Sequence, residues 1–228
     1  MWPERFDEDA LNAISRSVGT RNFTSLYQGS PVPAEGGMFK RHWWGRYRDL
    51  PPITRAEIMV DSAFKDGVAN DYSVFALWGT DGHDNLYLLR LWRERVEFPG
   101  LIQLGHTAMA WAKDAYPSLR IPLVVEDKAS GQSAIQTWKK PYYTRDGVLP
   151  ALPVIAFPAE TNKTARADGV TPVVEGGRAH IPERTIPHLD DWLTEHERFP
   201  NGAHDDCVDT TSMGITRLAP KVRKMGVY

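Results

Sequence analysis

The order of strand-type and helix-type segments is the feature that most constrains the fold of this chain. Three segments rich in apolar, β-branched and aromatic residues follow one another and are typical of strands: residues 56–60, 72–78 and 85–92. The run Gly79 to Gly82 supplies turn residues between the last two. Strands joined in this way form an antiparallel meander.

Strand and helix alternate along the rest of the chain. Further strands are expected at 121–125 and 154–157, and helices at 98–116, 129–138, 187–197 and 203–218. The β-branched residues of 170–181 around Gly176 and Gly177 predict a hairpin. The whole pattern predicts an α/β fold with a mixed sheet, in which three antiparallel strands continue into parallel strands and helices flank the faces.

Acidic residues stand where two of these strands end and where the last helix begins. Asp61 and Glu126 each follow a buried strand, whereas Asp205, Asp206 and Asp209 fall within five positions near the start of the last helix. Asp209 shares a helix face with both of its acidic neighbours. Such carboxylates repel one another unless cations lie between them. The pattern predicts a two-metal site for Mg²⁺ or Mn²⁺ of the kind that hydrolyses DNA phosphodiesters.

Each acid also has a purely structural interpretation. Asp61 could form a turn, and Glu126 could favour the N-terminus of the following helix. Asp205 and Asp206 could be ordinary first-turn helix acids. Asp209 is harder to explain in this way, because the helix dipole does not offset the repulsion of a third acid on one face. The combination of all five favours a metal site.

Basic residues and one histidine follow the same strand ends or helix start. Lys128, Lys163 and Arg166 could neutralise a scissile phosphate, or could be solvated surface side chains. His204 could ligate a metal, orient a water or contact a phosphate, or could simply begin the helix. Cys207 is the single cysteine, which excludes an intramolecular disulfide framework and a cysteine-rich zinc site.

Composition excludes several other classes of function. The net charge of −2 and the pI of about 6.4 give no global basic signature of nucleic-acid binding, so any DNA contact must rest on local patches. No apolar run approaches the roughly 18 residues that span a bilayer, and no signal-peptide pattern is present, so we expect a soluble protein. No phosphate-binding Gly-x-x-x-x-Gly-Lys-Ser/Thr loop occurs, so no ATPase of that type is visible.

The beginning of the chain differs from the rest. Asp7 can cap a helix that continues to about Val18. The residues after it are rich in glycine and proline with scattered aromatic residues, which indicates an extended arm lying on a surface rather than long regular structure. We therefore expect an arm or linker at 1–54, a folded domain at 55–218 and a basic tail at 219–228.

Five motifs follow one another along the folded part of the chain. They are Asp61–Lys65 with Asn70–Ser73, Val124–Gly131, Asn162–Ala167, Gly177–Pro182 and His204–Asp209. In this order they resemble the C-terminal nuclease half of the large terminase subunit of tailed bacteriophages, over about residues 55 to 218. Residues 2–6 and 23–31 resemble the segment that links the packaging ATPase to that nuclease.

This resemblance implies an RNase H-like fold and a metal-dependent endonuclease that cuts concatemeric viral DNA at the start and end of packaging. It implies that Asp61 and Glu126 are the first two metal ligands. The third ligand stays open between the pair Asp205 and Asp206, on one side, and Asp209 on the other. We favour Asp206 and Asp209, because they share a helix face.

The resemblance also implies partners. Double-stranded DNA would lie near Lys163 and Arg166, and a terminase ATPase domain, a small terminase subunit and a portal would assemble with the chain in the host cytoplasm, with no membrane involved. The linker-like start favours a domain excised from a longer protein over a motor on a separate polypeptide, and such a domain is expected to be monomeric. A Holliday-junction resolvase or other RNase H-like nuclease, and a non-catalytic docking module, remain as alternatives.

Overall fold

The computed structural model of the protein describes residues 7–27, 37–62, 72–158 and 162–220. Over these residues seven strands form one mixed sheet in the order β1-β9-β4-β3-β2-β5-β8. The strands are β1 Gly45–Tyr47, β2 Arg55–Asp61, β3 Ser73–Thr80, β4 Leu86–Glu94, β5 Leu123–Glu126, β8 Val154–Phe157 and β9 Ala179–Pro182. β2, β3 and β4 are antiparallel, and β5 and β8 continue in parallel beyond β2. The predicted fold class is therefore confirmed.

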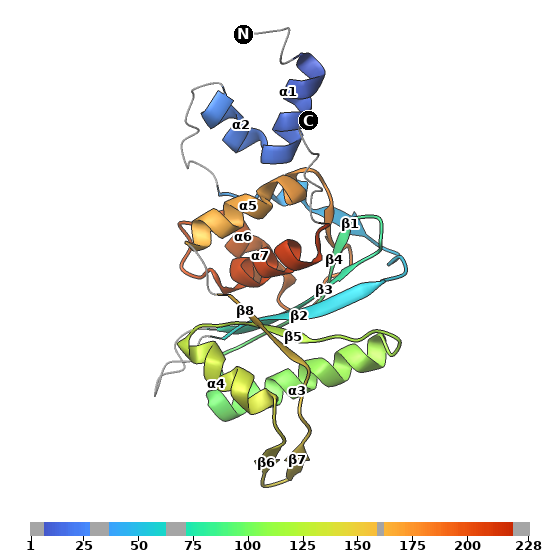
Figure 1. Ribbon diagram of the computed structural model, residues 1–228, viewed down its shortest axis with the longest axis vertical. Helices are drawn as coiled ribbons and strands as arrows, with labels where there is room; N and C mark the ends of the chain where they lie inside the picture. Colours follow the sequence, from blue (N-terminus) through green and yellow to red (C-terminus); the bar gives the residue numbers. More distant parts are fainter. Residues whose placement is uncertain (1–6, 28–36, 63–71, 159–161, 221–228) are drawn as a thin grey trace, which may run out of the picture.

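Helices cover both faces of the sheet (Figure 1). One face carries α3 Phe98–Ala115 and α4 Ala129–Trp138. The other carries α5 Lys163–Glu175, α6 Leu189–Arg198 and α7 Asp206–Leu218. A small separate hairpin, β6 Tyr142–Thr144 and β7 Gly147–Leu149, lies between α4 and β8 in the chain. Among the helices of the described residues, none combines the length and hydrophobicity that crossing a bilayer requires.

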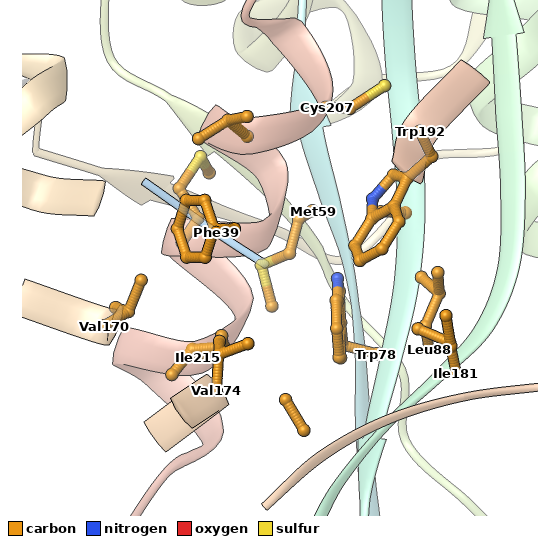
Figure 2. Close-up of a cluster of buried hydrophobic side chains, with 14 of the residues drawn as sticks. Phe39, Met59, Trp78, Leu88, Val170, Val174, Ile181, Trp192, Cys207 and Ile215 are labelled. Carbon is orange, nitrogen blue, oxygen red and sulfur yellow. The ribbon is translucent and has the colours of Figure 1, made fainter. Parts of the chain in front are cut away.

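Two hydrophobic cores lie on the two sides of the sheet, because successive side chains of a strand point to opposite faces. In β2, Ile58 and Val60 pack toward α3 and α4, whereas Met59 packs toward α7. Figure 2 shows Met59 and Trp78 in the core between the sheet and helices α5, α6 and α7, with Trp192 of α6 nearby. The same alternation places Asp61 on the α7 side of the sheet.

Two helices precede the sheet, α1 Glu8–Val18 and α2 Thr20–Tyr27. The predicted cap of the first is confirmed, since the Asp7 carboxylate accepts a hydrogen bond of 2.7 Å from the amide of Ala10. α2 lies in a passage where we expected no long regular structure. Both helices lie beside α5 (Figure 1), and the α2 backbone amide of Thr20 donates to Glu175 at 2.9 Å.

Part of the segment expected to be an arm lies inside the fold. Phe39 and Trp44 are buried in the core beneath α6 and α7. The short 3₁₀ turn η1 Arg41–Trp43 leads into β1, which pairs in parallel with β9 at one edge of the sheet. Phe39 and Trp44 therefore belong to the folded core rather than to an extended arm lying on a surface.

The hairpin predicted over 170–181 is wrong. This region contains the C-terminal half of α5 and the strand β9, which pairs with β1 on one side and with β4 on the other. The Asn162 side chain caps α5 by accepting from the amide of Thr164 at 2.9 Å. Val170 and Val174, four residues apart, are buried on one helix face. Burial at helical spacing outweighs the β propensity of these residues, which is a weak and context-dependent preference.

Candidate active site

Asp61 and Glu126 lie on one face of the sheet because of the register between their strands. β2 and β5 run in parallel with Met59 opposite Val124, and both of these side chains belong to the core beneath α7. Two residues later, Asp61 and Glu126 occupy equivalent positions on that face. Adjacent strands are separated by about 4.8 Å, so the two carboxylates are neighbours.

Helix α7 brings its acids to the same place. It packs against β2 and runs in the opposite direction, because Arg217 near its end contacts Glu57 near the start of β2, with Nε 2.5 Å from Oε2. The helix from Asp209 to Arg217 is about 12 Å long, and the strand from Glu57 to Asp61 is about 13 Å long. The matching lengths place Asp209 close to Asp61.

Two cations from the first turn of α5 lie among these carboxylates. Arg166 bridges two of them, with Nη1 2.7 Å from Glu126 Oε1 and Nη2 2.5 Å from Asp209 Oδ1. Lys163 also bridges two, with Nζ 2.5 Å from Asp209 Oδ2 and 2.7 Å from Asp205 Oδ1. Two of the three predicted basic residues, Lys163 and Arg166, therefore form ion pairs with the predicted acids.

The third predicted cation, Lys128, lies closer to solvent. Its Nζ is 2.6 Å from Glu126 Oε2, and its side chain remains 45% exposed. Burial by itself raises the pKa of Glu126, but the hydrogen bonds from Lys128 and Arg166 outweigh burial and hold that pKa below its usual value. Glu126 is therefore a stabilised, ionised carboxylate.

Asp61 is in the opposite situation. Within the part of the chain that the structure describes, it has no hydrogen bond or ion pair to a cation. Burial raises the pKa of Asp61 well above its usual value, and the charges of Asp209, Asp206 and Glu126 raise it further, while Lys163 opposes them. Negative charge on Asp61 is therefore unfavourable unless another cation approaches it.

The donor set suits a hard divalent cation, which prefers oxygen ligands. Among the described residues of the cluster, five carboxylates face three side-chain cations: Asp61, Glu126, Asp205, Asp206 and Asp209 against Lys128, Lys163 and Arg166. The excess of negative charge and the raised pKa of Asp61 both fit a metal ion. However, no three acidic, histidine or cysteine residues in the described ranges are arranged to hold one ion. Glu126 and Asp209 are instead held by Arg166 and Lys163.

Other residues hold the N-terminus of α7 in place. Glu195 of α6 accepts a hydrogen bond of 2.6 Å from the backbone amide of Cys207, and Arg93 at the end of β4 lies 3.6 Å from the same carboxylate. The Arg93 guanidinium lies 3.5 Å from the centre of the Tyr72 ring. His204 meets that ring edge to face, with ring centres 5.4 Å apart. His204 is thus brought near the acids but has no described contact with them.

The roles of Glu195 and Arg93 could not be inferred from the sequence. Glu195 lies three residues after Trp192, and both are buried. Helical spacing could therefore have marked Glu195 as an acid on the buried face of its helix, but it gives no information about the partner of that acid. Its partner amide lies on another helix, and only the tertiary fold reveals it.

The backbone of α4 at Gly131 lies directly against the backbone carbonyl of Glu126 and helps to fix the position of that residue. A Cβ atom at Gly131 would lie 2.0 Å from the carbonyl oxygen of Glu126. The first turn of α4 can therefore begin directly next to the end of β5 only because residue 131 has no side chain. The backbone amide of Lys128 also donates to the Glu126 carbonyl at 2.9 Å.

The sequence from residue 58 to residue 218 matches the family described as the terminase RNase H-like domain. The chain belongs to this family. The family match covers the sheet from Ile58 of β2 onward, without β1, together with both helical layers and all the acids of the site, and it confirms the predicted resemblance. No curated protein matches the sequence.

Solved structures show the same fold. The large terminase of a thermophilic bacteriophage, in complex with ADP, aligns with a TM-score of 0.62 and 11% identity over 93% of this chain and 52% of the phage protein. Another structure of that terminase has a TM-score of 0.59 and 12% identity, covering 93% and 53%. The human cytomegalovirus terminase nuclease domain, Mn soaked with inhibitor bound, has a TM-score of 0.51 and 10% identity, covering 72% and 83%. The terminase domain described here thus spans about half the length of the phage large terminase.

Proposed function

We propose that this terminase domain is a Mg²⁺- or Mn²⁺-dependent endodeoxyribonuclease that cuts concatemeric viral DNA during genome packaging. The observation that carries the proposal is the parallel register of β2 and β5, which sets Asp61 beside Glu126 on the face covered by the acidic start of α7. Membership of the terminase RNase H-like family and the Mn-soaked nuclease domain among similar structures support it.

The proposed catalytic carboxylates are Asp61, Glu126, Asp206 and Asp209, with Asp205 as an additional candidate ligand. Bound between them, two divalent ions would supply an activated water and neutralise charge on the attacking and leaving oxygens of the phosphodiester. The acids come from two paired strands and a helix packed on them, which is a rigid support for ligands.

The basic residues are proposed to neutralise the DNA phosphate. Lys128 suits this role in its present position, because its side chain is 45% exposed. The Lys163 side chain is 37% exposed, whereas that of Arg166 is only 6% exposed, so the arginine can reach a phosphate only after leaving its carboxylates. His204, which contacts Tyr72 edge to face, is proposed as an auxiliary residue at the edge of the site.

The proposed setting is the packaging machine in the host cytoplasm. Double-stranded DNA is the substrate, and an ATPase domain, a small terminase subunit and a portal are the proposed partners. The similarity to half of a phage large terminase supports a role beside a motor domain. The isolated domain is proposed to be monomeric.

The test is cleavage of supercoiled plasmid by the wild-type domain and by Asp61→Asn. We expect nicking and linearisation with Mn²⁺ or Mg²⁺, none with EDTA, and a loss of at least about 100-fold in the variant, because the removed charge is needed to hold the ions. Asp114→Asn, an exposed acid of α3 on the opposite face of the sheet, is the matched control and should cut normally. Undiminished cleavage by Asp61→Asn would refute the assignment, and a strong preference for four-way junctions would favour a resolvase.

The melting temperature of Asp61→Asn separates catalysis from folding. A carboxyl group whose pKa is raised in the folded state destabilises the protein at any pH above the lower pKa of the unfolded chain, because ionisation is easier in the unfolded chain. We therefore expect Asp61→Asn to melt at the same temperature as wild type in EDTA at pH 7.5, or a few degrees above it, on the order of 2–4 °C per kcal/mol gained. A marked fall in melting temperature would mean that the loss of cleavage reports misfolding.

A further inference from the structure

Lys163 and Arg166 occupy the first turn of α5, where positive charge is unfavourable. The N-terminus of a helix carries a partial positive charge from its unpaired amides, so cations there are repelled. Asn162 caps this helix in the usual way, which confirms that the turn is its true beginning. The two cations must therefore be stabilised by something outside their own helix.

The contacts of Arg166 supply that stabilisation. Its side chain is 6% exposed, and its two terminal nitrogens point to carboxylates of different elements, Glu126 on β5 and Asp209 on α7. A buried cation is tolerated only when it is well paired. Two buried carboxylates that face each other likewise need a cation between them to offset their mutual repulsion. Arg166 is thus both held by the acids and necessary to hold them together.

We propose that Arg166, assisted by Lys163, is a resident counter-ion that holds Glu126 and Asp209 in position before metal binds, and that divalent ions must compete with it for these carboxylates. This inference rests on the proposed function in one respect, namely that the ions are those of the nuclease. Arg166 is then a positioning residue. Its presence lowers the affinity of the domain for metal and raises its stability without metal.

The competition predicts opposite effects of one substitution. In Arg166→Gln, two buried carboxylates lose their shared cation, so the metal-free protein becomes less stable, while the ions no longer compete with the arginine and meet only the weaker competition of Lys163. We expect a lower melting temperature in EDTA, and a Mn²⁺ dissociation constant at least about tenfold lower than wild type by isothermal titration calorimetry, because close charge pairs are strongly coupled. The increase in melting temperature on adding Mn²⁺ should also be larger in the variant than in wild type.

Two further variants keep the test decisive. Lys163→Gln removes a cation from a side chain that is 37% exposed, so it should fold in any case, and it should also bind Mn²⁺ more tightly than wild type. Arg217→Gln removes another charged contact of α7, to Glu57 at the opposite end of β2. It should lower the melting temperature but leave the Mn²⁺ dissociation constant unchanged, which distinguishes competition from a general loss of stability.

Equal or weaker Mn²⁺ binding by both Arg166→Gln and Lys163→Gln would overturn the inference, since it would mean that the cations support the metal site rather than compete with it. The proposed function fails by a different result, namely plasmid cleavage that does not need divalent ions or Asp61. Calorimetry without DNA therefore tests the competition independently of cleavage.

Discussion

His196 is a titratable side chain placed entirely inside an aromatic core. Its ring lies 3.9 Å from that of Trp192 and 5.3 Å from those of Phe39 and Trp44, measured between ring centres. Nδ1 lies 2.7 Å from the carbonyl oxygen of Trp192, which can only accept, so Nδ1–H is the donor. Burial lowers the pKa of His196 to about 3. The residue is therefore neutral in the folded state at any ordinary pH.

The low pKa predicts a loss of stability on acidification. The unfolded chain protonates near pH 6.5 and the folded one near pH 3, so the stability due to neutral His196 is complete above 6.5 and is lost as pH falls toward 3. The slope is about 1.4 kcal/mol per pH unit, which corresponds to about 2 kcal/mol between pH 6.5 and pH 5. Thermal melts at pH 7 and pH 5 measure it.

His196→Phe is the comparison variant, and its melting temperature should depend less on pH over this range. The pKa of His106 is also lowered by burial, so some dependence will remain. Asp61 acts in the opposite direction, because its raised pKa makes the folded state more stable as pH falls. Both proteins keep Asp61, so the difference between them isolates His196. An identical pH dependence in the two would contradict the prediction.

At the scale of elements, the position of α7 decides the geometry of the candidate site. Gly214 in this helix lies directly over Trp78 of β3, and a Cβ atom there would be 2.8 Å from the indole Cδ1. Trp78 is fully buried in the core that also contains Met59 and Trp192 (Figure 2), so shifting its ring would disturb the surrounding packing. The helix carrying Asp206 and Asp209 can therefore approach the sheet only because residue 214 is glycine.

Gly214→Ala should destabilise the domain. Alanine favours the helix by up to about 1 kcal/mol over glycine, but overpacking a dense core costs about 1–3 kcal/mol, so we expect a net loss of about 1–2 kcal/mol in urea unfolding. The matched control is Gly169→Ala in α5, where a Cβ atom meets nothing within 4 Å. That change should instead stabilise by about 0.5–1 kcal/mol. Equal effects at the two positions would contradict this account of α7 packing.

At the scale of the whole molecule, the segment before the sheet has two unequal parts. α1 has no buried residue, and α2 makes exposed or half-buried hydrogen bonds to the domain, such as Asn22 to Asp168 at 2.9 Å. Phe39 and Trp44, in contrast, are 1% and 3% exposed in the core. The folded unit thus includes residues before 55, the position at which we expected the domain to start.

Two truncations test this division. Removing residues 1–36 deletes α1 and α2 and should lower the free energy of unfolding by at most about 1–2 kcal/mol, the scale of a few exposed hydrogen bonds. Removing 1–54 also deletes Phe39, Trp44 and β1, and each buried aromatic side chain alone is worth about 3–5 kcal/mol. We expect the first variant to remain folded by circular dichroism and the second to be unfolded or aggregated. Similar melting temperatures for both would contradict it.

The sequence determined the type and order of the main elements and the candidate acids. The strands β2 and β5 could be predicted because burial on both faces leaves a continuous apolar run. The hairpin at 170–181 was wrong because Val170 and Val174 owe their conformation to packing against a distant sheet. The edge strand β1 gave no pattern of its own, since it is only three residues long.

The tertiary structure alone decided how the charges are paired. The sequence identifies Asp61, Glu126, Asp209 and Arg166 as charged residues, but charges interact over a few ångströms in space and not along the chain. The parallel register of β2 and β5 and the packing of α7 on the sheet bring these residues together. Glu126 and Asp209 then share Arg166, whereas Asp61 has no paired cation among the described residues. Local composition sets which groups are available, whereas folding sets which of them meet.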